Sequence, residues 1–183
     1  LLDEPFSGLD TSMRVRVREQ TLNVLKQAGV ATLMVTHDPQ EAMYMADRIK
    51  VMGAGGQVLQ SGRPHEIYYK PVDEYVARLF GPVNEISSTV SAGVVSTPFG
   101  AIPANGFAEG TNVKVLIRPE SFRLLRDRAG SDGCGIDVVA SHLLGDSTLV
   151  EFGLAGLSDH NGAQTWKVQI PGNFDPANHA LCE

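Results

Sequence analysis

In the first eighty residues, continuous apolar runs alternate with segments whose apolar positions have helical spacing. Leu1 and Leu2 are predicted to end one strand, and the apolar run at residues 31–35 predicts a second strand covered on both faces. Between them, residues 13–28 place apolar side chains three and seven positions apart, which predicts a helix, and Gly29 follows where a left-handed residue often ends one. This order predicts βα units that feed a parallel sheet.

The residues after the second predicted strand indicate another helix. Asp38 is a capping residue, Pro39 suits the first helical position, and Glu41 provides an acid at the third. A helix over 39–46 is therefore expected. Two short strands joined by a glycine-rich turn follow, and then two short helices, at 49–52, 57–60, 64–69 and 73–80.

The pattern changes after Gly81 and Pro82. Beyond this point short β-type runs alternate with Gly, Pro, Asn and Asp, and helical periodicity almost disappears, which predicts a small barrel or sandwich. The expected fold is therefore an α/β domain over 1–81 followed by a small all-β domain over 82–183. The candidate strands of the second domain are 89–95, 112–118, 136–141, 148–152 and 165–170.

Composition and charge narrow the classes of function. The chain is 43% hydrophobic and 20% charged, and no stretch approaches the roughly 18–20 consecutive apolar residues of a membrane-spanning helix. The formal net charge is −6: the first eighty residues carry nine Lys and Arg against ten Asp and Glu, and the remainder carry six against eleven. Nucleic acid is not expected as a partner, because binding a phosphate backbone requires a basic surface. No secretory signal is visible.

The two cysteines, Cys134 and Cys182, are too few for a disulfide scaffold and lack metal-ligand spacing. Free thiols in a reducing cytoplasm are expected, and a bridge between the two cysteines stays open as an alternative. The sequence does not indicate a role for either.

Candidate chemistry lies where the two predicted strands of the first domain end. Asp3 and Glu4 follow the first strand, and His37 follows the second. At the carboxyl edge of a parallel sheet, one acid can hold Mg²⁺ while its neighbour, pointing the other way, orients a water for in-line attack. Each residue also has a plainer interpretation: adjacent acids are often solvated turn residues, and a lone histidine is often a loop residue. Asp10 has the plainer interpretation of a helix N-cap.

The combination of these segments is more specific than any one of them. LLDEP at 1–5, SGLD at 7–10 and VTHD at 35–38 follow one another with a predicted helix between the last two. In this order they resemble the Walker B segment, the D-loop and the histidine loop of ABC ATPases. The resemblance covers residues 1–70 and implies a partial P-loop NTPase sheet with helices.

The resemblance also implies roles for individual residues, with ATP and Mg²⁺ as cofactors. Asp3 would be the acid associated with Mg²⁺, directly or through water. Glu4 would be the general base that polarises the attacking water, and His37 would sense or stabilise the γ-phosphate. Ser7 and Asp10 would communicate across a nucleotide-sandwich dimer.

The rest of the chain resembles import-type ABC ATPases more closely. Residues 47–71 are similar to the end of their nucleotide-binding domain, and VLIRPE at 115–120 and LLGDSTLV at 143–150 are similar to the hallmarks of the OB-like (TOBE) regulatory domain. The junction at 80–84 looks most like that of ferric-iron importers. Importers of spermidine/putrescine, thiamine and sugars share this architecture.

Several motifs of the family do not occur in the chain. There is no GxxxxGK[ST] loop and no LSGGQ-type motif. The chain is therefore expected to be a C-terminal fragment of an ABC importer ATP-binding protein, inactive by itself. The implied partners are a second ATPase subunit, integral-membrane permease subunits and, indirectly, a periplasmic or lipoprotein solute-binding protein. The implied location is the cytoplasmic face of the membrane, with peripheral attachment.

A different class of function remains open for this sequence. The second domain could act as a regulatory, dimerisation or ligand-sensing module without ATPase activity. The sequence does not show which solute is transported, because substrate choice lies in other subunits of an importer.

Overall fold

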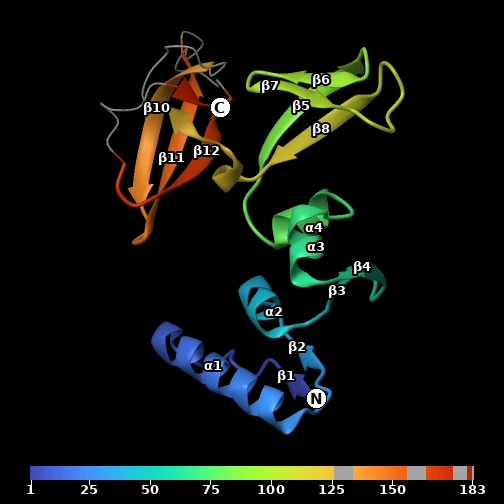
Figure 1. Ribbon diagram of the computed structural model, residues 1–183, viewed down its shortest axis with the longest axis vertical. Coiled ribbons are helices and arrows are strands. Elements are labelled where there is room, and N and C mark those ends of the chain that lie inside the picture. The colour runs from blue at the N-terminus through green and yellow to red at the C-terminus, as the bar shows by residue number, and fades with distance from the viewer. Residues whose placement is uncertain (126–133, 156–163, 175–180, 183) are drawn as a thin grey trace. The chain divides into compact units, whose positions relative to one another are not determined.

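The chain divides between Gly81 and Pro82 into two compact units, Leu1–Gly81 and Pro82–Glu183. The computed structural model describes residues 1–125, 134–155, 164–174, 181 and 182. In this part of the chain the first unit contains helices and strands, whereas the second consists of strands and one short 3-10 helix (Figure 1). A mixed α/β part followed by a β-rich part is therefore confirmed.

The first unit begins with a parallel pair of strands. β1 (Leu2–Asp3) pairs with β2 (Met34–Val35), with Leu2 opposite Met34 and Asp3 opposite Val35. The predicted strand at 31–35 is thus shorter than expected, because its residues form a ladder only where β1 stands opposite them. Since the strands are parallel, the segments that follow β1 and β2 leave the pair at the same edge.

α1 (Thr11–Ala28) connects the two strands and is capped at both ends. The Asp10 side chain accepts a hydrogen bond from the Met13 N–H, and Gly29 ends the helix with a φ of 62°. No residue of α1, all of which the structure describes, is buried, and Val15 and Val24 on its apolar stripe are exposed. The helix therefore contributes caps and polar contacts to this unit but little to its core.

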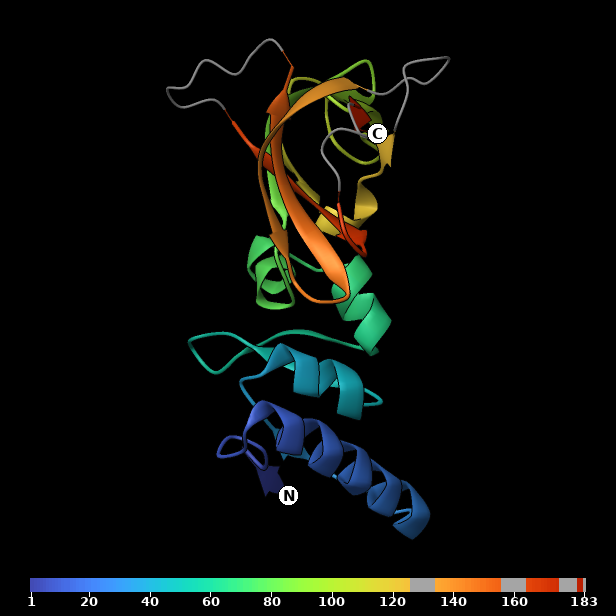
Figure 2. The same ribbon diagram turned by 90° about the vertical axis from the view of Figure 1, so that its left-hand side faces the viewer.

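α2 (Pro39–Met45) lies beside α1, as Figures 1 and 2 both show. Its cap is Asp38, as predicted, with Pro39 in the first turn. β3 (Ile49–Met52) and β4 (Val58–Gly62) form an antiparallel pair, followed by α3 (Pro64–Tyr69) and α4 (Glu74–Leu79). These elements share a small core formed by Ile49, Val51, Ile67 and Val76.

The second unit contains two antiparallel sheets. The four-stranded sheet has the order β7-β6-β5-β8. The five-stranded sheet has the order β12-β11-β10-β13-β9, and η1 (Pro119–Ser121) precedes β9. The strands are β5 (Asn84–Ser91), β6 (Val94–Thr97), β7 (Gly100–Pro103), β8 (Asn112–Ile117), β9 (Leu124–Leu125), β10 (Cys134–Leu143), β11 (Ser147–Leu154), β12 (Trp166–Pro171) and β13 (Leu181–Cys182).

One predicted strand of this unit is wrong. The run at 89–95 is not continuous, because Ala92 and Gly93 have φ values of 52° and 74° and reverse the chain between β5 and β6. Left-handed backbone at both central residues is typical of a tight hairpin turn. The pairing of β10 with β13 places Cys134 opposite Cys182, so the backbone register is compatible with the bridge left open above.

The core of the second unit is aromatic. The ring of Phe99 makes edge contacts with Phe122 and Trp166, and Phe152 is completely buried beside them. Val150 and Val168 belong to the same cluster of buried side chains, together with Ile86, Ile136 and Phe174. Among the described residues, no helix of either unit has both the length and the apolar composition needed to cross a membrane.

A buried amide joins the two sheets of the second unit. Asn84 on β5 is 7% exposed, its Nδ2 donates to the Lys167 carbonyl on β12 at 2.7 Å, and its Oδ1 accepts from the Lys167 N–H at 2.7 Å. Because β12 is at the edge of its sheet, this side chain takes the place of a neighbouring strand.

We expect Asn84→Ala to destabilise the second unit by about 2–4 kcal/mol, because both backbone groups of Lys167 would lose their partner. Urea unfolding followed by Trp166 fluorescence measures the change. The matched control is Asn112→Ala, an exposed asparagine on β8 whose Oδ1 accepts a hydrogen bond from Thr89 Oγ1, where a change within about 0.5 kcal/mol is expected. Equal effects of the two variants would contradict this account.

Candidate functional site

The edge where β1 and β2 end brings Glu4 and His37 together. The Glu4 N–H donates to the Val35 carbonyl at 2.9 Å, which extends the parallel ladder one step past Asp3. Glu4 then has a φ of 46°, a left-handed conformation uncommon for residues other than glycine. Such backbone persists where surrounding contacts hold it, and here those contacts come from the chain that leaves β2.

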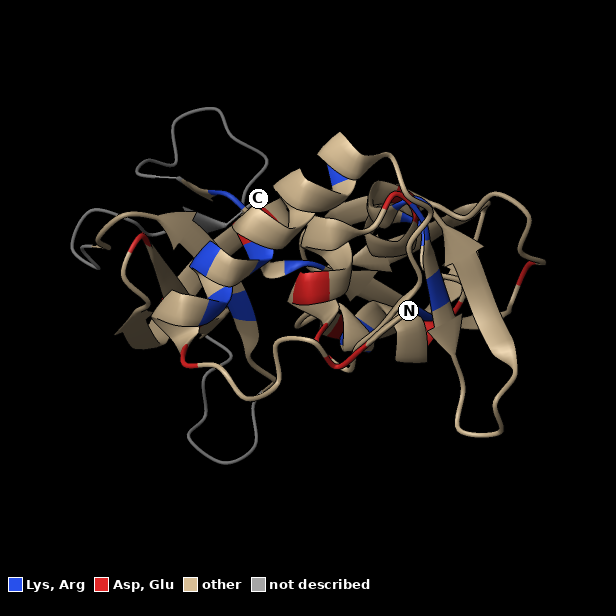
Figure 3. Ribbon diagram, turned by 90° about the horizontal axis from the view of Figure 1, so that it is seen from below, with Lys and Arg blue, Asp and Glu red and all other residues tan. Residues whose placement is uncertain are grey.

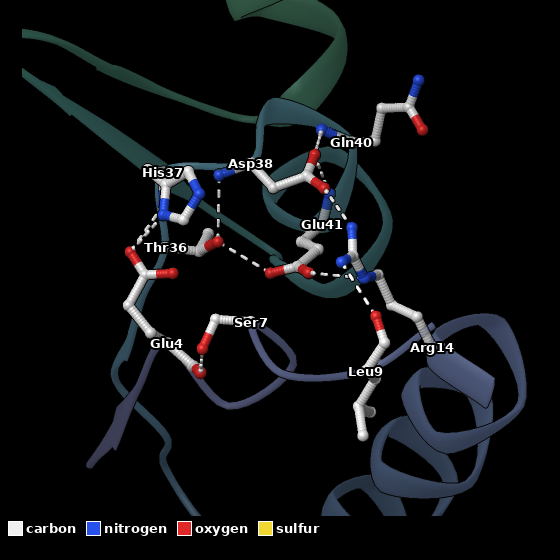
Figure 4. A network of polar contacts seen from close by, with 9 residues as sticks. All are labelled: Glu4, Ser7, Leu9, Arg14, Thr36, His37, Asp38, Gln40 and Glu41. Atoms are coloured by element: carbon white, nitrogen blue, oxygen red, sulfur yellow. Dashed lines mark hydrogen bonds and ion pairs between the residues drawn. The ribbon is translucent and has the colours of Figure 1, made fainter. Parts of the chain in front are cut away.

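Two contacts join Glu4 to His37 (Figure 4). Glu4 Oε1 lies 2.7 Å from His37 Nδ1 and also accepts the His37 backbone N–H at 3.0 Å. The side chain of His37 is 79% exposed and that of Glu4 is 34% exposed. With Nδ1 directed at the carboxylate, Nε2 is the ring nitrogen that a ligand could contact. The pair therefore has a fixed orientation but remains open to a ligand from solvent.

The carboxylate sets the charge state of the imidazole. The hydrogen bond to Glu4 raises the pKa of His37 above its usual value of 6.5, and the negative charges of Glu4, Glu41 and Asp38 act in the same direction. The protonated ring is favoured because it can donate from Nδ1 to a charged acceptor.

Asp3 is the last residue of β1 and is exposed. Among the described residues there is no group of three or more His, Cys, Asp or Glu that could enclose a metal ion.

The segment after Glu4 forms a tight turn that leads into α1. Ser7 Oγ and Ser7 N–H both donate to the Glu4 carbonyl, at 3.0 and 3.3 Å. Asp10 Oδ1 accepts from the Met13 N–H and the Ser12 hydroxyl, which lowers the pKa of Asp10. The structure therefore places Ser7 against the Glu4 backbone and uses Asp10 as the helix cap. Among the described residues, neither side chain forms a hydrogen bond with the Glu4 carboxylate or the His37 ring.

Sequence reasoning missed a polar network next to this pair. Glu41 is only 3% exposed and accepts a hydrogen bond from Thr36 Oγ1 at 2.7 Å. Arg14 of α1 faces the same carboxylate and also that of Asp38 (Figure 4). Glu41 was expected only as an acid favouring the helix start. The sequence does show an arginine, Arg14, one turn after the helix cap. Its acidic partners lie more than twenty residues away, so the sequence pattern does not identify the network.

Three arginines of α1, at positions 14, 16 and 18, alternate with valines in the sequence but have different surroundings in the structure. Figure 3 shows that basic residues gather in the first half of this helix. Arg14 is half-buried against the acidic side chains of α2, whereas Arg16 is exposed. The guanidinium of Arg18 lies over the ring of Tyr44, 4.2 Å from its centroid. α1 and α2 are thus joined mainly by arginine contacts.

Curated proteins with similar sequences include ATP-binding proteins of import systems. The chain is 41% identical over 140 residues to an Fe(3+) ions import ATP-binding protein of Rhodococcus jostii, covering 75% of this chain and 40% of that protein. It is 35% identical over 181 residues to the Fe(3+) ions import ATP-binding protein of Mesorhizobium japonicum, covering 98% and 47%. A spermidine/putrescine import ATP-binding protein of Oleidesulfovibrio alaskensis is 41% identical over 133 residues, covering 68% and 35%.

The chain thus spans less than half the length of these relatives. No protein-family model matches it. The similarity to the Mesorhizobium protein includes both units, since it extends over nearly the whole chain.

We expect Glu4→Gln to lower the pKa of His37 towards 6.5, because the variant removes the charge that favours the imidazolium. An NMR titration of the imidazole measures it. The contact should stabilise the folded chain fully below pH 6.5, and this stabilisation should disappear as the pH rises through the raised pKa of the folded state.

The matched control is Glu19→Gln, an exposed acid on α1. It removes the same charge from the chain without touching the pair, so the His37 titration should stay as in the wild type. A wild-type His37 titration in Glu4→Gln would show that the carboxylate does not control the ring.

Proposed function

The chain belongs to the family of ATP-binding proteins of ABC importers, and from this premise we propose that it carries part of the ATP-hydrolysing site of such a subunit. The observation that supports this most directly is the contact of Glu4 with His37 at the shared edge of β1 and β2. A carboxylate and an imidazole at this edge face the side on which ligands bind in open parallel sheets.

Within this proposal Glu4 acts as the general base. One oxygen, Oε1, is occupied by Nδ1 and the backbone N–H of His37, which leaves Oε2 to accept a proton from the attacking water. The water then forms a bond to the γ-phosphorus while the bond to the β–γ bridging oxygen breaks, giving ADP and phosphate. His37 supports this step from Nε2, by donating a hydrogen bond to the γ-phosphate.

Asp3 is the residue that would hold Mg²⁺, directly or through water. The ion, when bound, neutralises charge on the phosphates. Ser7 and Asp10 are proposed to act across a dimer of ATPase subunits. Their observed contacts support a more limited part of this role: they keep the turn between Glu4 and α1 in one conformation, which is needed if that turn is to face a second subunit.

Ferric iron is the solute that we propose, because relatives in Rhodococcus, Mesorhizobium and Pseudomonas are named as Fe(3+) ions import ATP-binding proteins. The partners would then be permease subunits in the membrane and, indirectly, a solute-binding protein, with the ATPase attached peripherally to the cytoplasmic face. The 82–183 unit is proposed to be the OB-like (TOBE) regulatory domain, supported by its two antiparallel sheets and its own aromatic core.

A second candidate function is a regulatory or dimerisation module without ATPase activity. The observation that favours it is a difference between the units. The second has a large aromatic core, whereas the first has a small core at β3, β4, α3 and α4 and an α1 that buries none of its described residues. The two candidates differ in whether Glu4 is needed for turnover, and the following experiment separates them.

In the complete protein, Glu4→Gln should reduce ATP turnover by about a hundredfold or more while nucleotide binding persists, because the base is lost but the phosphate contacts are not. Phosphate release and equilibrium binding of a labelled nucleotide measure the two quantities. Glu19→Gln on α1 serves as the control and should keep wild-type turnover. Turnover of Glu4→Gln at the wild-type rate would remove Glu4 from the base role and favour the module.

The 183-residue chain by itself should show no ATP turnover above background, because it contains no glycine-rich phosphate loop. A phosphate-release assay on the purified chain checks this. Turnover that disappears in the Glu4→Gln variant would contradict the expectation, since it would show that this chain alone completes a site.

A further inference from the structure

Arg14 contacts both loops that meet at the Glu4–His37 pair. Its Nη2 donates to the carbonyl of Leu9 at 3.1 Å, at the end of the turn that follows Glu4. Its Nη1 lies 3.6 Å from Asp38 Oδ2, and its Nε lies 4.0 Å from Glu41 Oε1, both in the segment that follows His37. One side chain from the first turn of α1 thus contacts three oxygens in two segments that are distant in sequence (Figure 4).

The residues that Arg14 contacts hold the backbone on both sides of His37. Asp38 caps α2 by accepting the Gln40 N–H at 2.8 Å, and its own N–H donates to Thr36 Oγ1 at 3.1 Å. Thr36 in turn donates to Glu41. His37 lies between Thr36 and Asp38 and has little packing of its own, since 79% of its side chain is exposed. Its position therefore depends on these neighbours.

The carboxylate of Glu41 explains why a cation is needed here. A side chain that is 3% exposed loses nearly all of its hydration, so a negative charge there requires a partner. Arg14 is the cation that the structure places beside it. A planar guanidinium offers five donors in a fixed fork and can contact several oxygens at once, whereas an ammonium is a single point of charge.

We propose that Arg14 is a positioning residue that couples the SGLD turn to the histidine loop: by holding Leu9, Asp38 and Glu41 together, it sets the geometry in which Glu4 meets His37. This inference rests on the proposed function and extends it, because it adds a residue outside the Glu4–His37 pair. A displacement of the turn at Leu9 is passed through Arg14 to the start of α2, and hence to His37.

The direction in which the pKa of His37 changes when Arg14 is replaced distinguishes a positioning role of Arg14 from a purely electrostatic one. Removing the positive charge of Arg14 would, by charge alone, raise the pKa of His37, since Glu41 and Asp38 would act on the ring unopposed. Loss of positioning has the opposite effect, because the hydrogen bond to Glu4 is the main cause of the raised pKa. Glu4, Asp38, Glu41 and Arg14 are the charged groups that surround the ring in this network.

We therefore expect Arg14→Met to lower the pKa of His37 in the 183-residue chain, as measured by NMR titration of the imidazole. Arg14→Lys should lower it too, but less, because it keeps the charge and loses the fork. Arg16→Met, an exposed arginine on the same helix, is the matched control and should leave the titration unchanged. If Arg14→Met does not fold, as judged by its ¹H–¹⁵N spectrum, Arg14→Lys decides the question.

In the complete protein, both Arg14 variants should reduce kcat for ATP hydrolysis by about tenfold or more, with KM for ATP changed by less than about twofold. Arg16→Met should behave as the wild type. A merely structural role for Arg14 would reduce stability without shifting the His37 titration of the folded chain.

The inference is overturned if the pKa of His37 stays the same or rises in Arg14→Met, or if Arg14→Lys retains both the wild-type titration and the wild-type kcat. The failure of the proposed function would look different. Wild-type turnover of Glu4→Gln would remove the catalytic assignment, whereas a fall in the His37 pKa in the Arg14 variants would still show the coupling in the chain itself.

Discussion

The site depends on the parallel pairing of β1 and β2. Asp3 stands opposite Val35, and the ladder continues to the Glu4 N–H, so Glu4 and His37, which are 33 positions apart, leave the sheet side by side. Parallel strands end at the same edge, whereas an antiparallel pair would have sent His37 to the far end of β1. The left-handed backbone of Glu4 then turns the carboxylate towards the imidazole. A two-residue ladder can fix this geometry only because side-chain contacts reinforce it on both sides.

Those contacts involve two kinds of groups: exposed side chains at the site and buried side chains that hold them in position. Glu4 and His37 are both accessible to solvent, so packing alone does not hold them. The buried carboxylate of Glu41 and the guanidinium of Arg14 are held more firmly, since separating them would leave a charge in a poorly hydrated place. Thr36 and Asp38 connect this anchor to the backbone around His37. An open site can therefore be rigid when the residues beside its reactive groups are anchored in the interior.

The sequence predicted local features well and missed those that depend on distant contacts. Asp10, Asp38 and Gly29 were identified as caps because their signals lie within a few residues of the helix ends. The strand at 89–95 was wrong because its apolar residues continue through Ala92 and Gly93, and the alternation of β-type residues does not show where the chain reverses. The meeting of Glu4 and His37 followed from strand order. The contacts of Arg14 did not, since nothing near it in the sequence distinguishes it from Arg16.

The two units differ in how far their own elements cover their apolar side chains. In the second unit, strands pair with one another, and Asn84 satisfies the edge of β12 across the two sheets, so the aromatic core is enclosed by the unit itself. In the first unit, α1 meets α2 through arginine contacts, while Val15 and Val24 face solvent. Apolar side chains on an amphipathic helix are normally covered, so this surface fits a protein in which further elements pack on α1. The polar network around Arg14 is on the side of α1 towards α2, and it can therefore keep its geometry whatever covers the apolar stripe. This separation explains how a short parallel pair retains the arrangement of Glu4 and His37.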